Sequence, residues 1–328
     1  MRDFGECIGV EGNGDVLPRR DLLKAMGVGL LAAPALGAAR EDLRAKAKKN
    51  LKLAVHTTPY AALSVAEAAR RIKSKGFGGV LTDYVFADAR FDPLAPDWKA
   101  AAKVVGSFER HGVRIVGVFG YVNVVDPVAA RRKRGEARME TLIKNWKRLG
   151  CPNVSTETGT FNPKSDWVEA PENATEQGYL QCRSALEKLA RMAEKAGAVV
   201  SIEPYWRNVI DSIARTERLF REVNSPALKL VMDPCNYFRK EDLPRMKPML
   251  EDMFRRLAPQ IVLAHAKDVK ASADGTDLPA SGLGVLDYPL YLRLLARLDR
   301  PMDLVIEHVA LEDVPRARDY VLGQMERV

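Results

Sequence analysis

The chain has few cysteines and no cysteine motif. Only four of its 328 residues are cysteine. They form no Cys-x-x-Cys pair and no spacing typical of zinc fingers, so neither a disulfide framework nor a structural zinc site is indicated. We interpret all of them as ordinary thiols: Cys7, Cys151, Cys182 and Cys235.

The chain also lacks a concentrated patch of one charge. Its 51 Lys and Arg residues against 43 Asp and Glu residues give a net charge of +8, which invites a nucleic-acid interpretation. The excess is dispersed along the chain, however. Its only dense cluster is RRKR at residues 131–134, where a solvated helix surface is the simpler explanation. We therefore expect no nucleic-acid partner.

No apolar run is long enough to span a bilayer. Residues 17–39, LPRRDLLKAMGVGLLAAPALGAA, instead resemble a twin-arginine export signal. Arg19 and Arg20 precede a variable residue, two leucines and Lys24, and the short apolar run that follows ends in small residues that a signal peptidase accepts. An N-terminal helix of the folded domain is the alternative, but glycines and Pro34 make this segment a poor helix.

The resemblance to an export signal predicts that the chain has two parts. Residues 1–39 are predicted to be the signal peptide and residues 40–328 the mature protein. The resemblance implies export by the twin-arginine (Tat) machinery, which carries proteins already folded and often loaded with a cofactor, to the periplasm or the outside of the cell. No lipid-attachment cysteine follows the apolar run, so we expect no stable membrane anchor.

Short apolar runs alternate with helical patterns from residue 51 onward. Residues 64–75 open with SVAE, a capping-box pattern, and residues 175–196 carry apolar side chains at helical spacing. Such alternation predicts parallel strand pairing. The eight predicted strands are residues 51–55, 79–81, 114–119, 153–156, 198–202, 228–232, 261–264 and 303–306.

Eight strand–helix units predict an α/β protein, a (β/α)8 TIM barrel that forms a single domain. A doubly wound open sheet is the competing fold. After the first predicted strand, however, the sequence reads HTTPYAAL and lacks the glycine-rich loop of dinucleotide-binding proteins. In a barrel the active site lies where the strands end, so polar residues are expected at the C-terminal ends of the strands.

Four consecutive strands end in potential metal ligands. Because neighbouring strands lie only about 5 Å apart, these side chains should converge at the mouth of the barrel. Three carboxylates so close together would repel one another unless a cation balanced them. The predicted ligands of a divalent metal ion are Glu203 after AVVSI, Asp233 after LKLVM, His265 after IVLA and Glu307 after DLVI.

The donor set favours a hard cation. Oxygen-rich ligation with one imidazole suits Mn²⁺, and Mg²⁺, Co²⁺ and Zn²⁺ are the alternatives. A single acidic residue at a strand end is explained equally well as a helix cap or as the partner of a lysine. Four potential ligands at successive strand ends are harder to explain in that way.

The motifs that carry these residues, IEPYWRN, VMDPCNYF, LAHAKDVK and LVIEHV, resemble the xylose-isomerase-like TIM barrel superfamily. That superfamily includes sugar isomerases, ketose 3-epimerases, inosose dehydratases and endonuclease IV repair enzymes. The resemblance covers residues 51–309 and extends to GFGGV in the second unit and to SGLGVLDYPLYLRLL after the seventh strand. Together these motifs are specific for the superfamily but not for one member.

The resemblance implies a metal-dependent sugar isomerase or epimerase. In the epimerase branch, two glutamates contact the metal and flank the substrate. One removes a proton from the carbon beside a carbonyl, which gives an enediolate, and the other returns it. Glu203 and Glu307 match these residues, whereas Asp233 and His265 would act mainly as ligands. The implied substrate is a keto-sugar or a related carbohydrate.

Other residues at the strand ends are candidates for substrate contact. Many ketose epimerases carry a histidine where this chain has Asn236, so the substrate is left open. Lys267 resembles a pocket-facing lysine of the family, with a surface role as the alternative. The full set of candidates is His56, Tyr121, Glu157, Trp206, Asn236 and Lys267.

Several of these residues also have purely structural interpretations. Glu157 is equally explained as a helix cap or as the partner of a nearby arginine such as Arg207. Tyr205 and Trp206 could stack on a sugar face, with core packing as the alternative. His308 is expected to point towards the helices because it neighbours Glu307 on a strand. His111 is assigned to a helix end. Residues 208–211 are expected to begin the helix after the fifth strand.

Three alternative functions follow from the same motifs. A lyase or dehydratase of an oxidised sugar or glycoside would use the same enolisation step. A nuclease of the endonuclease IV kind fits less well, because that branch needs more histidines than the four in this chain and has a histidine ligand in place of Asn236. Non-catalytic sugar binding is the third alternative. A homo-oligomer is compatible with all of them.

Overall fold

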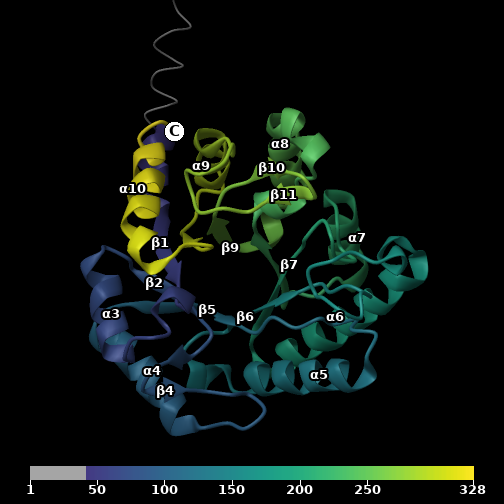
Figure 1. The fold of residues 1–328 in the computed structure, drawn as a ribbon, viewed down its shortest axis with the longest axis horizontal. Coiled ribbons are helices and arrows are strands. Elements are labelled where there is room, and N and C mark those ends of the chain that lie inside the picture. The colour runs from purple at the N-terminus through teal and green to yellow at the C-terminus, as the bar shows by residue number, and fades with distance from the viewer. Residues whose placement is uncertain (1–41) are drawn as a thin grey trace, which may run out of the picture. The chain divides into compact units, whose positions relative to one another are not determined.

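The computed structural model describes residues 42–328, of which residues 43–328 form one compact unit. Eight parallel strands close into a barrel in the order β1-β12-β9-β8-β7-β6-β5-β2 (Figure 1). This confirms the (β/α)8 fold. The strands are β1 Leu51–His56, β2 Gly79–Thr82, β5 Arg114–Phe119, β6 Asn153–Glu157, β7 Val199–Glu203, β8 Leu228–Met232, β9 Ile261–Ala266 and β12 Met302–Ile306.

The helices lie outside this barrel (Figure 1). As the SVAE pattern predicts, Ser64 caps the helix Val65–Ser74, where its hydroxyl accepts a hydrogen bond from the backbone N–H of Glu67 at 3.3 Å. Residues 42–50 are also helical. The α-helices are α3 Val65–Ser74, α4 Trp98–Arg110, α5 Ala129–Lys144, α6 Glu176–Ala196, α7 Ile213–Val223, α8 Met246–Leu257, α9 Tyr288–Ala296 and α10 Val314–Met325.

Shorter elements occupy the connections. Two hairpins pair antiparallel strands, β3 Val85–Phe86 with β4 Ala89–Arg90 and β10 Lys270–Ser272 with β11 Gly275–Asp277. The 3₁₀ helices are η1 Thr58–Tyr60, η2 Trp146–Leu149, η3 Pro171–Ala174, η4 Pro234–Tyr237, η5 Lys240–Arg245, η6 Ala258–Gln260 and η7 Leu311–Asp313. Neither hairpin is predicted from the sequence.

The helix after the fifth strand begins later than expected. It starts at Ile213 because the hydroxyl of Ser212 caps it, accepting a hydrogen bond from the backbone N–H of Arg215 at 3.4 Å. Asn208 is buried and holds a loop instead. Its side-chain amide oxygen accepts a hydrogen bond from the Gly159 backbone N–H at 3.2 Å. The prediction that residues 208–211 begin the helix is therefore wrong.

The barrel interior is filled by apolar side chains. One cluster of buried residues lies inside the barrel, and a larger cluster lies between the strands and the surrounding helices. The inner cluster closes the barrel below the ends of the strands, so polar side chains at those ends rest on an apolar floor. The residues of this floor are Ala54, Leu81, Val116, Val231, Leu263 and Val305, with Phe119 packed against them.

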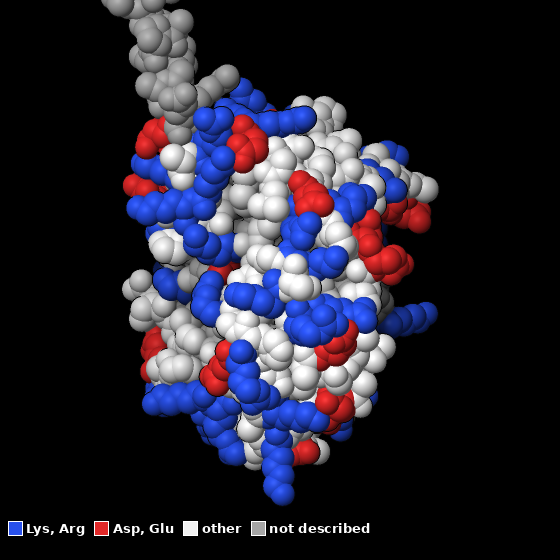
Figure 2. All heavy atoms as spheres, turned by 90° about the vertical axis from the view of Figure 1, so that its left-hand side faces the viewer, with Lys and Arg blue, Asp and Glu red and all other residues white. Residues whose placement is uncertain are grey.

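Basic side chains are spread over the face shown in Figure 2, with acidic side chains among them. Several cations in the α3 and α10 region form surface ion pairs, including Arg70 with Glu67 at 2.7 Å and Arg318 with Asp319 at 2.6 Å. Within residues 42–328, no helix combines the length and the apolar character that a membrane span needs. The predicted export signal lies outside the described residues.

Candidate metal centre and active site

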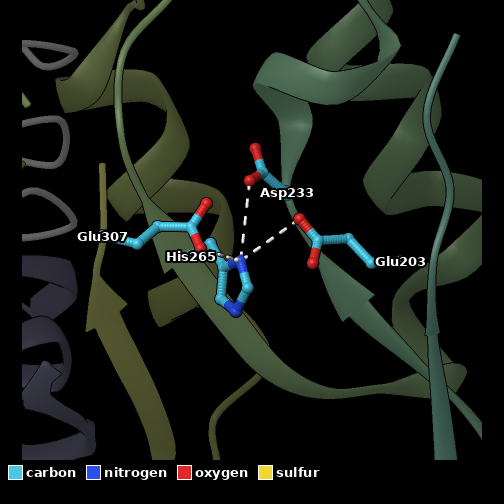
Figure 3. A group of neighbouring side chains, drawn as sticks. All are labelled: Glu203, Asp233, His265 and Glu307. Atoms are coloured by element: carbon cyan, nitrogen blue, oxygen red, sulfur yellow. Dashed lines mark ion pairs between the residues drawn. The ribbon is translucent and has the colours of Figure 1, made fainter. Parts of the chain in front are cut away.

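The four predicted metal ligands converge at the C-terminal end of the barrel. Glu203 ends β7, Asp233 follows β8, His265 lies near the end of β9 and Glu307 follows β12. One ligand atom from each residue lies within 4.8 Å of the others, and all four side chains are buried. Figure 3 shows Glu203 and Glu307 on opposite sides of the His265 ring. Consecutive strands therefore bring together residues that are far apart in the sequence.

The spacing of these atoms fits one divalent ion. Nδ1 of His265 lies 3.3 Å from a carboxylate oxygen of Glu203, 3.3 Å from one of Glu307 and 3.6 Å from one of Asp233. Ligands about 2.0 to 2.4 Å from a common ion are about 3 to 4 Å apart. Both ring nitrogens of His265 are buried, and neither has a hydrogen-bond partner within the described chain. Once it has given up a proton, such an imidazole can bind a metal ion.

Lys267 places a second positive charge beside the carboxylates. Its ammonium nitrogen lies 2.7 Å from Asp233 Oδ2 and 2.8 Å from Glu307 Oε1, and the side chain is only 3% exposed. Burial lowers the pKa of Lys267, but the surrounding carboxylates outweigh burial and raise it well above its usual value. Lys267 therefore remains charged. Of its two predicted roles, the structure excludes an exposed surface position.

Burial and neighbouring charges shift the pKa values of the ligands in different directions. Burial raises the pKa of Glu203. Burial also acts to raise the pKa of Glu307, but His265 and Lys267 outweigh it and hold that pKa well below its usual range. For Asp233, Lys267 likewise overcomes burial and lowers the pKa. Burial opposes the charged form of His265, whose pKa the carboxylates nonetheless raise well above its usual value.

Two neighbours orient the carboxylate of Glu203. The amide of Asn236, on η4, donates a hydrogen bond to Oε1 at 2.7 Å, and the hydroxyl of Tyr121 donates to Oε2. The Tyr121 ring in turn stacks on Phe119, with centroids 4.0 Å apart. Tyr121 and Asn236 were predicted to contact substrate, and both do line the cavity. The structure adds that both fix the position of Glu203.

Glu157 brings a further carboxyl group to the same place. It ends β6 directly beside Glu203, to which it is paired in the sheet. Its Oε2 is buried without a hydrogen-bond partner in the described chain, and burial raises the pKa of Glu157 to about 8. The guanidinium of Arg207 donates instead to the Asp274 backbone carbonyl at 2.6 Å. The interpretation of Glu157 as the partner of Arg207 is therefore wrong.

Glu157, Glu203, Lys267 and Glu307 line a cavity of about 660 Å³. His56, a candidate for substrate contact, lies on its wall with its ring 4.7 Å from that of Phe119, and burial lowers the pKa of His56. The cavity is lined by His56, Thr58, Pro59, Phe119, Tyr121, Glu157, Trp167, Glu203, Tyr205, Asn236, Lys267, Thr276, Asp277, Leu278, Glu307, His308 and Val309.

Trp206 does not line this cavity. Its side chain is buried, and the guanidinium groups of Arg207 and Arg239 lie 4.4 and 4.9 Å from the ring centroid. The indole N–H donates to the Thr276 hydroxyl at 3.2 Å. Gly275 of the β10–β11 hairpin has φ +127° and leaves room for the ring, which a Cβ there would meet at 3.0 Å. Trp206 therefore supports the hairpin that forms part of the cavity wall, as its structural interpretation expects.

His308 differs from its predicted orientation. The strand ends at Ile306, so the alternation of side chains no longer holds two residues later. His308 adopts φ +54° and lines the cavity, where its Nε2 lies 3.7 Å from Glu307 Oε1. Its Nδ1–H donates to the backbone carbonyl of Leu278 at 2.8 Å. Its position beside a strand-end glutamate is the sequence signal that could have identified it.

Other cavity residues come from loops that sequence patterns do not place. Trp167 lies in the β6–α6 loop, and residues 276–278 belong to or follow the β10–β11 hairpin. Both segments are polar and irregular in sequence. Tyr205, by contrast, follows Glu203 closely, and the sequence already suggests it as a residue that stacks on a sugar.

The fold and this cluster define a class of proteins, the (β/α)8 barrels in which acidic residues and a histidine gather at the C-terminal mouth. Within that class, the chain belongs to the xylose isomerase-like TIM barrel family, whose profile matches residues 69–321. This confirms the resemblance noted in the sequence. Among curated protein sequences, no significant match is found.

Solved structures of similar fold include several sugar enzymes. The 3-keto-D-glucoside 4-epimerase of E. coli is 18% identical with a TM-score of 0.63, over 85% of this chain and 100% of that one. Mannonate dehydratase of Streptococcus suis is 18% identical with a TM-score of 0.62, over 84% and 93%. A magnesium complex of a xylose isomerase-like barrel protein from Mycobacterium smegmatis is 15% identical with a TM-score of 0.60, over 84% and 96%.

Proposed function

We propose that this protein is a divalent-metal-dependent sugar isomerase or epimerase that acts on a keto-sugar or a related carbohydrate. The observation that carries this proposal is the placement of two glutamates, Glu203 and Glu307, on opposite sides of one ligand cluster at the base of a single cavity. Sugar epimerases are among the proteins of similar fold, which supports the choice of chemistry.

Glu203, Asp233, His265 and Glu307 would hold the ion. When bound, a divalent cation supplies positive charge beside the substrate carbonyl and so makes the neighbouring C–H more acidic. We favour Mn²⁺ for the oxygen-rich donor set, and the magnesium complex of a protein with this fold is consistent with a hard cation in general.

The two glutamates would exchange protons with the carbon beside the carbonyl. Because they face the cavity from opposite sides, one can take a proton from one face of that carbon while the other returns a proton to the opposite face. This sequence inverts the configuration at the carbon. Tyr121 and Asn236 fix Glu203 by hydrogen bonds, and Lys267 fixes Glu307, so both carboxylates are positioned before substrate arrives.

Glu157 favours a second candidate function, elimination from an oxidised sugar or glycoside. A lyase or dehydratase needs an acid that protonates the leaving group, and Glu157 is a cavity carboxyl whose pKa is raised by burial to about 8 in the metal-free protein. Its Oε2 has no hydrogen-bond partner within the described residues, so that the carboxyl is available to a ligand. Mannonate dehydratase is among the proteins of similar fold.

Residues 1–39 complete the proposal. Their twin-arginine pattern supports export of the folded and metal-loaded protein by the Tat machinery to the periplasm or the outside of the cell. A fusion of residues 1–39 to a reporter that is active only after export tests this directly. Replacement of Arg19 and Arg20 by lysine should abolish export, and continued export would contradict a twin-arginine signal.

The catalytic proposal is tested by incubating metal-loaded protein with ketoses and 3-keto-glucosides in D₂O. Deuterium incorporation beside the carbonyl, followed by nuclear magnetic resonance, would demonstrate enolisation. Recovery of an epimer or isomer selects the first candidate, and release of a leaving group selects the second. Absence of exchange from every substrate in the panel, with the metal site filled, would contradict both.

A further inference from the structure

The cavity is larger than a single sugar ring needs. Its volume of about 660 Å³ lies within the range of about 300 to 1,000 Å³ that is typical of sites for drug-sized ligands. One hexose bound at the ligand cluster would leave much of this space to water. The unused part of the cavity is therefore a place for a further group of the substrate.

The two parts of the cavity differ in chemistry. Its buried end carries charged and amide groups, among them Glu157, Asn236 and Lys267, which match sugar hydroxyl groups. Its more exposed end combines the apolar residues Pro59, Trp167, Tyr205, Leu278 and Val309 with the polar residues Thr58, Asp277 and His308. A pyranose ring has polar edges and flatter faces of C–H groups, and such a face packs well on aromatic rings. The exposed end thus suits the face of a second ring.

Trp167 is the most informative residue of this exposed end. Its side chain is 55% exposed, an unusual state for so large an apolar group. Its ring stands edge-on to Tyr205, with centroids 6.4 Å apart and planes at 66°. Single apolar side chains on a surface need no explanation. Here, however, two aromatic rings meet on the wall of the cavity that Glu203 and Glu307 also line.

Hydrogen bonds on both sides hold the segment that carries Trp167. The amide of Asn123 donates to Asp166 Oδ1 at 3.0 Å, and the amide of Asn208 donates to the Asp166 backbone carbonyl at 3.4 Å. On the other side, the Thr160 hydroxyl donates to the Val168 backbone carbonyl at 2.8 Å. The segment is therefore fixed to the barrel while the indole stays exposed. Such preorganisation lowers the entropic cost of binding a ring.

We propose that Trp167 and Tyr205 form a second subsite, which binds the ring next to the reacting sugar. This assigns glycosides, in particular disaccharides, rather than free monosaccharides as the substrate class. The inference rests on the proposed function for the identity of the reacting sugar. The subsite itself, however, is defined by binding and can be tested without turnover.

The first test measures binding by calorimetry, with metal-loaded protein and three probes: methyl β-D-glucoside, cellobiose and phenyl β-D-glucoside. We expect the two-ring probes to bind roughly tenfold more tightly than the one-ring probe, as burial of one more ring on an aromatic pair implies. In Trp167→Ala this advantage should fall to under threefold, and Trp167→Phe should keep most of it. The exposed apolar residue Leu94, which does not line the cavity, provides the matched control Leu94→Ala.

The three probes also distinguish the possible occupants. Tighter binding of cellobiose than of methyl β-D-glucoside supports a sugar as the second ring. Tighter binding of phenyl β-D-glucoside alone would overturn the assignment to disaccharides. Equal affinity for all three probes in the wild-type protein, or an advantage that Trp167→Ala leaves intact, would overturn the subsite.

The second test measures deuterium exchange into the 3-keto forms of methyl β-D-glucoside and cellobiose. We expect Trp167→Ala to lower kcat/KM roughly tenfold for the two-ring substrate and at most threefold for the other, chiefly through KM. An equal loss for both substrates, or no loss, would overturn the subsite. If no substrate exchanges in the wild-type protein but the Trp167-dependent preference in binding holds, the proposed function fails and the subsite stands.

Discussion

The two ends of the barrel both contain a hollow lined by charged residues, but they differ in how those charges are placed. At the N-terminal end, a hollow of about 720 Å³ is lined by Lys48, Lys52, Lys75, Arg318 and Glu326, among others. Lys48 pairs with Glu326 there at 2.7 Å, and both side chains are more than half exposed. At the C-terminal end, the charged side chains of the ligand cluster are almost fully buried.

This difference shows that the volume of a hollow and the number of its charges do not by themselves indicate a functional site. Exposed ion pairs stabilise a protein by about 0 to 1 kcal/mol because water screens them. Buried charges interact far more strongly with one another and shift each other's pKa values. Burial of several carboxylates beside one imidazole and one ammonium group costs free energy, and such clusters are typical of sites that bind an ion or a substrate.

The largest expected effect concerns catalysis at the C-terminal end. Glu307→Gln and Glu203→Gln keep the shape of the side chain but cannot accept a proton. We expect each to lower the rate of deuterium exchange by about 10² to 10⁴-fold. The matched change at the N-terminal end, Glu326→Gln, should leave the rate unchanged. Either active-site variant retaining more than a tenth of the wild-type rate would contradict the assigned roles.

The next effect concerns metal binding and stability. With free Mn²⁺ at a hundred times its dissociation constant, the wild-type protein should gain about 2.7 kcal/mol of unfolding free energy. Asp233→Asn should lose most of this gain, because it removes a charged ligand. Glu326→Gln serves again as the control and should keep it. Thermal unfolding with and without a chelator measures the metal-dependent gain in each protein. An equal gain in Asp233→Asn and Glu326→Gln would argue against the site.

Lysine residues at the two ends provide a third comparison. In metal-free protein, Lys267→Met leaves buried carboxylates without their cation and should lower the free energy of unfolding by about 3 kcal/mol. Lys52→Met, at an exposed position in the N-terminal hollow, should change it by under about 0.5 kcal/mol. Urea titration gives both values. Two variants of equal stability would mean that the buried ammonium is not needed to balance the cluster.

Glu157 predicts a smaller effect that depends on pH. Its pKa is about 8 in the folded protein, against a usual value of 4.5. Between these values the folded state holds a proton that the unfolded state has released, so this carboxyl destabilises the fold increasingly as pH rises from 5 to 8. Gln cannot ionise. Metal-free Glu157→Gln should therefore gain about 2 kcal/mol relative to wild type over this range, since water in the cavity reduces the full effect.

Urea titrations of the two metal-free proteins at pH 5, 6, 7 and 8 give this difference directly. The advantage of the variant should be small at pH 5 and greatest at pH 8. A difference that stays constant over the whole range would show that Glu157 has an ordinary pKa, and the argument for its role as an acid in elimination would then fail.

The regular part of the fold could be predicted from the sequence. All eight barrel strands coincide with mainly apolar runs such as residues 114–119 and 228–232, because a strand covered on both faces requires mostly apolar side chains. The ligand cluster follows from the strands. Once parallel strands are adjacent, their last residues must meet at one edge, so Glu203, Asp233, His265 and Glu307 could be identified together.

The irregular part could not be predicted in this way. Trp206 and Trp167 are both aromatic residues near the site, yet one is buried beneath a hairpin and the other lines the cavity. Their positions depend on contacts between distant segments, such as the hydrogen bond from Trp206 to Thr276. His308 shows the same limit on a smaller scale, because a turn with positive φ replaces the alternation of the strand. Local patterns carry no information on such contacts.

The most direct test is a crystal structure of the Mn²⁺-loaded protein with anomalous scattering data collected at the manganese edge. We expect one strong anomalous peak at the C-terminal end of the barrel, about 2.0 to 2.4 Å from ligand atoms of Glu203, Asp233, His265 and Glu307. A fully occupied peak elsewhere, or a cluster that stays closed around Lys267 with no ion at saturating Mn²⁺, would contradict it.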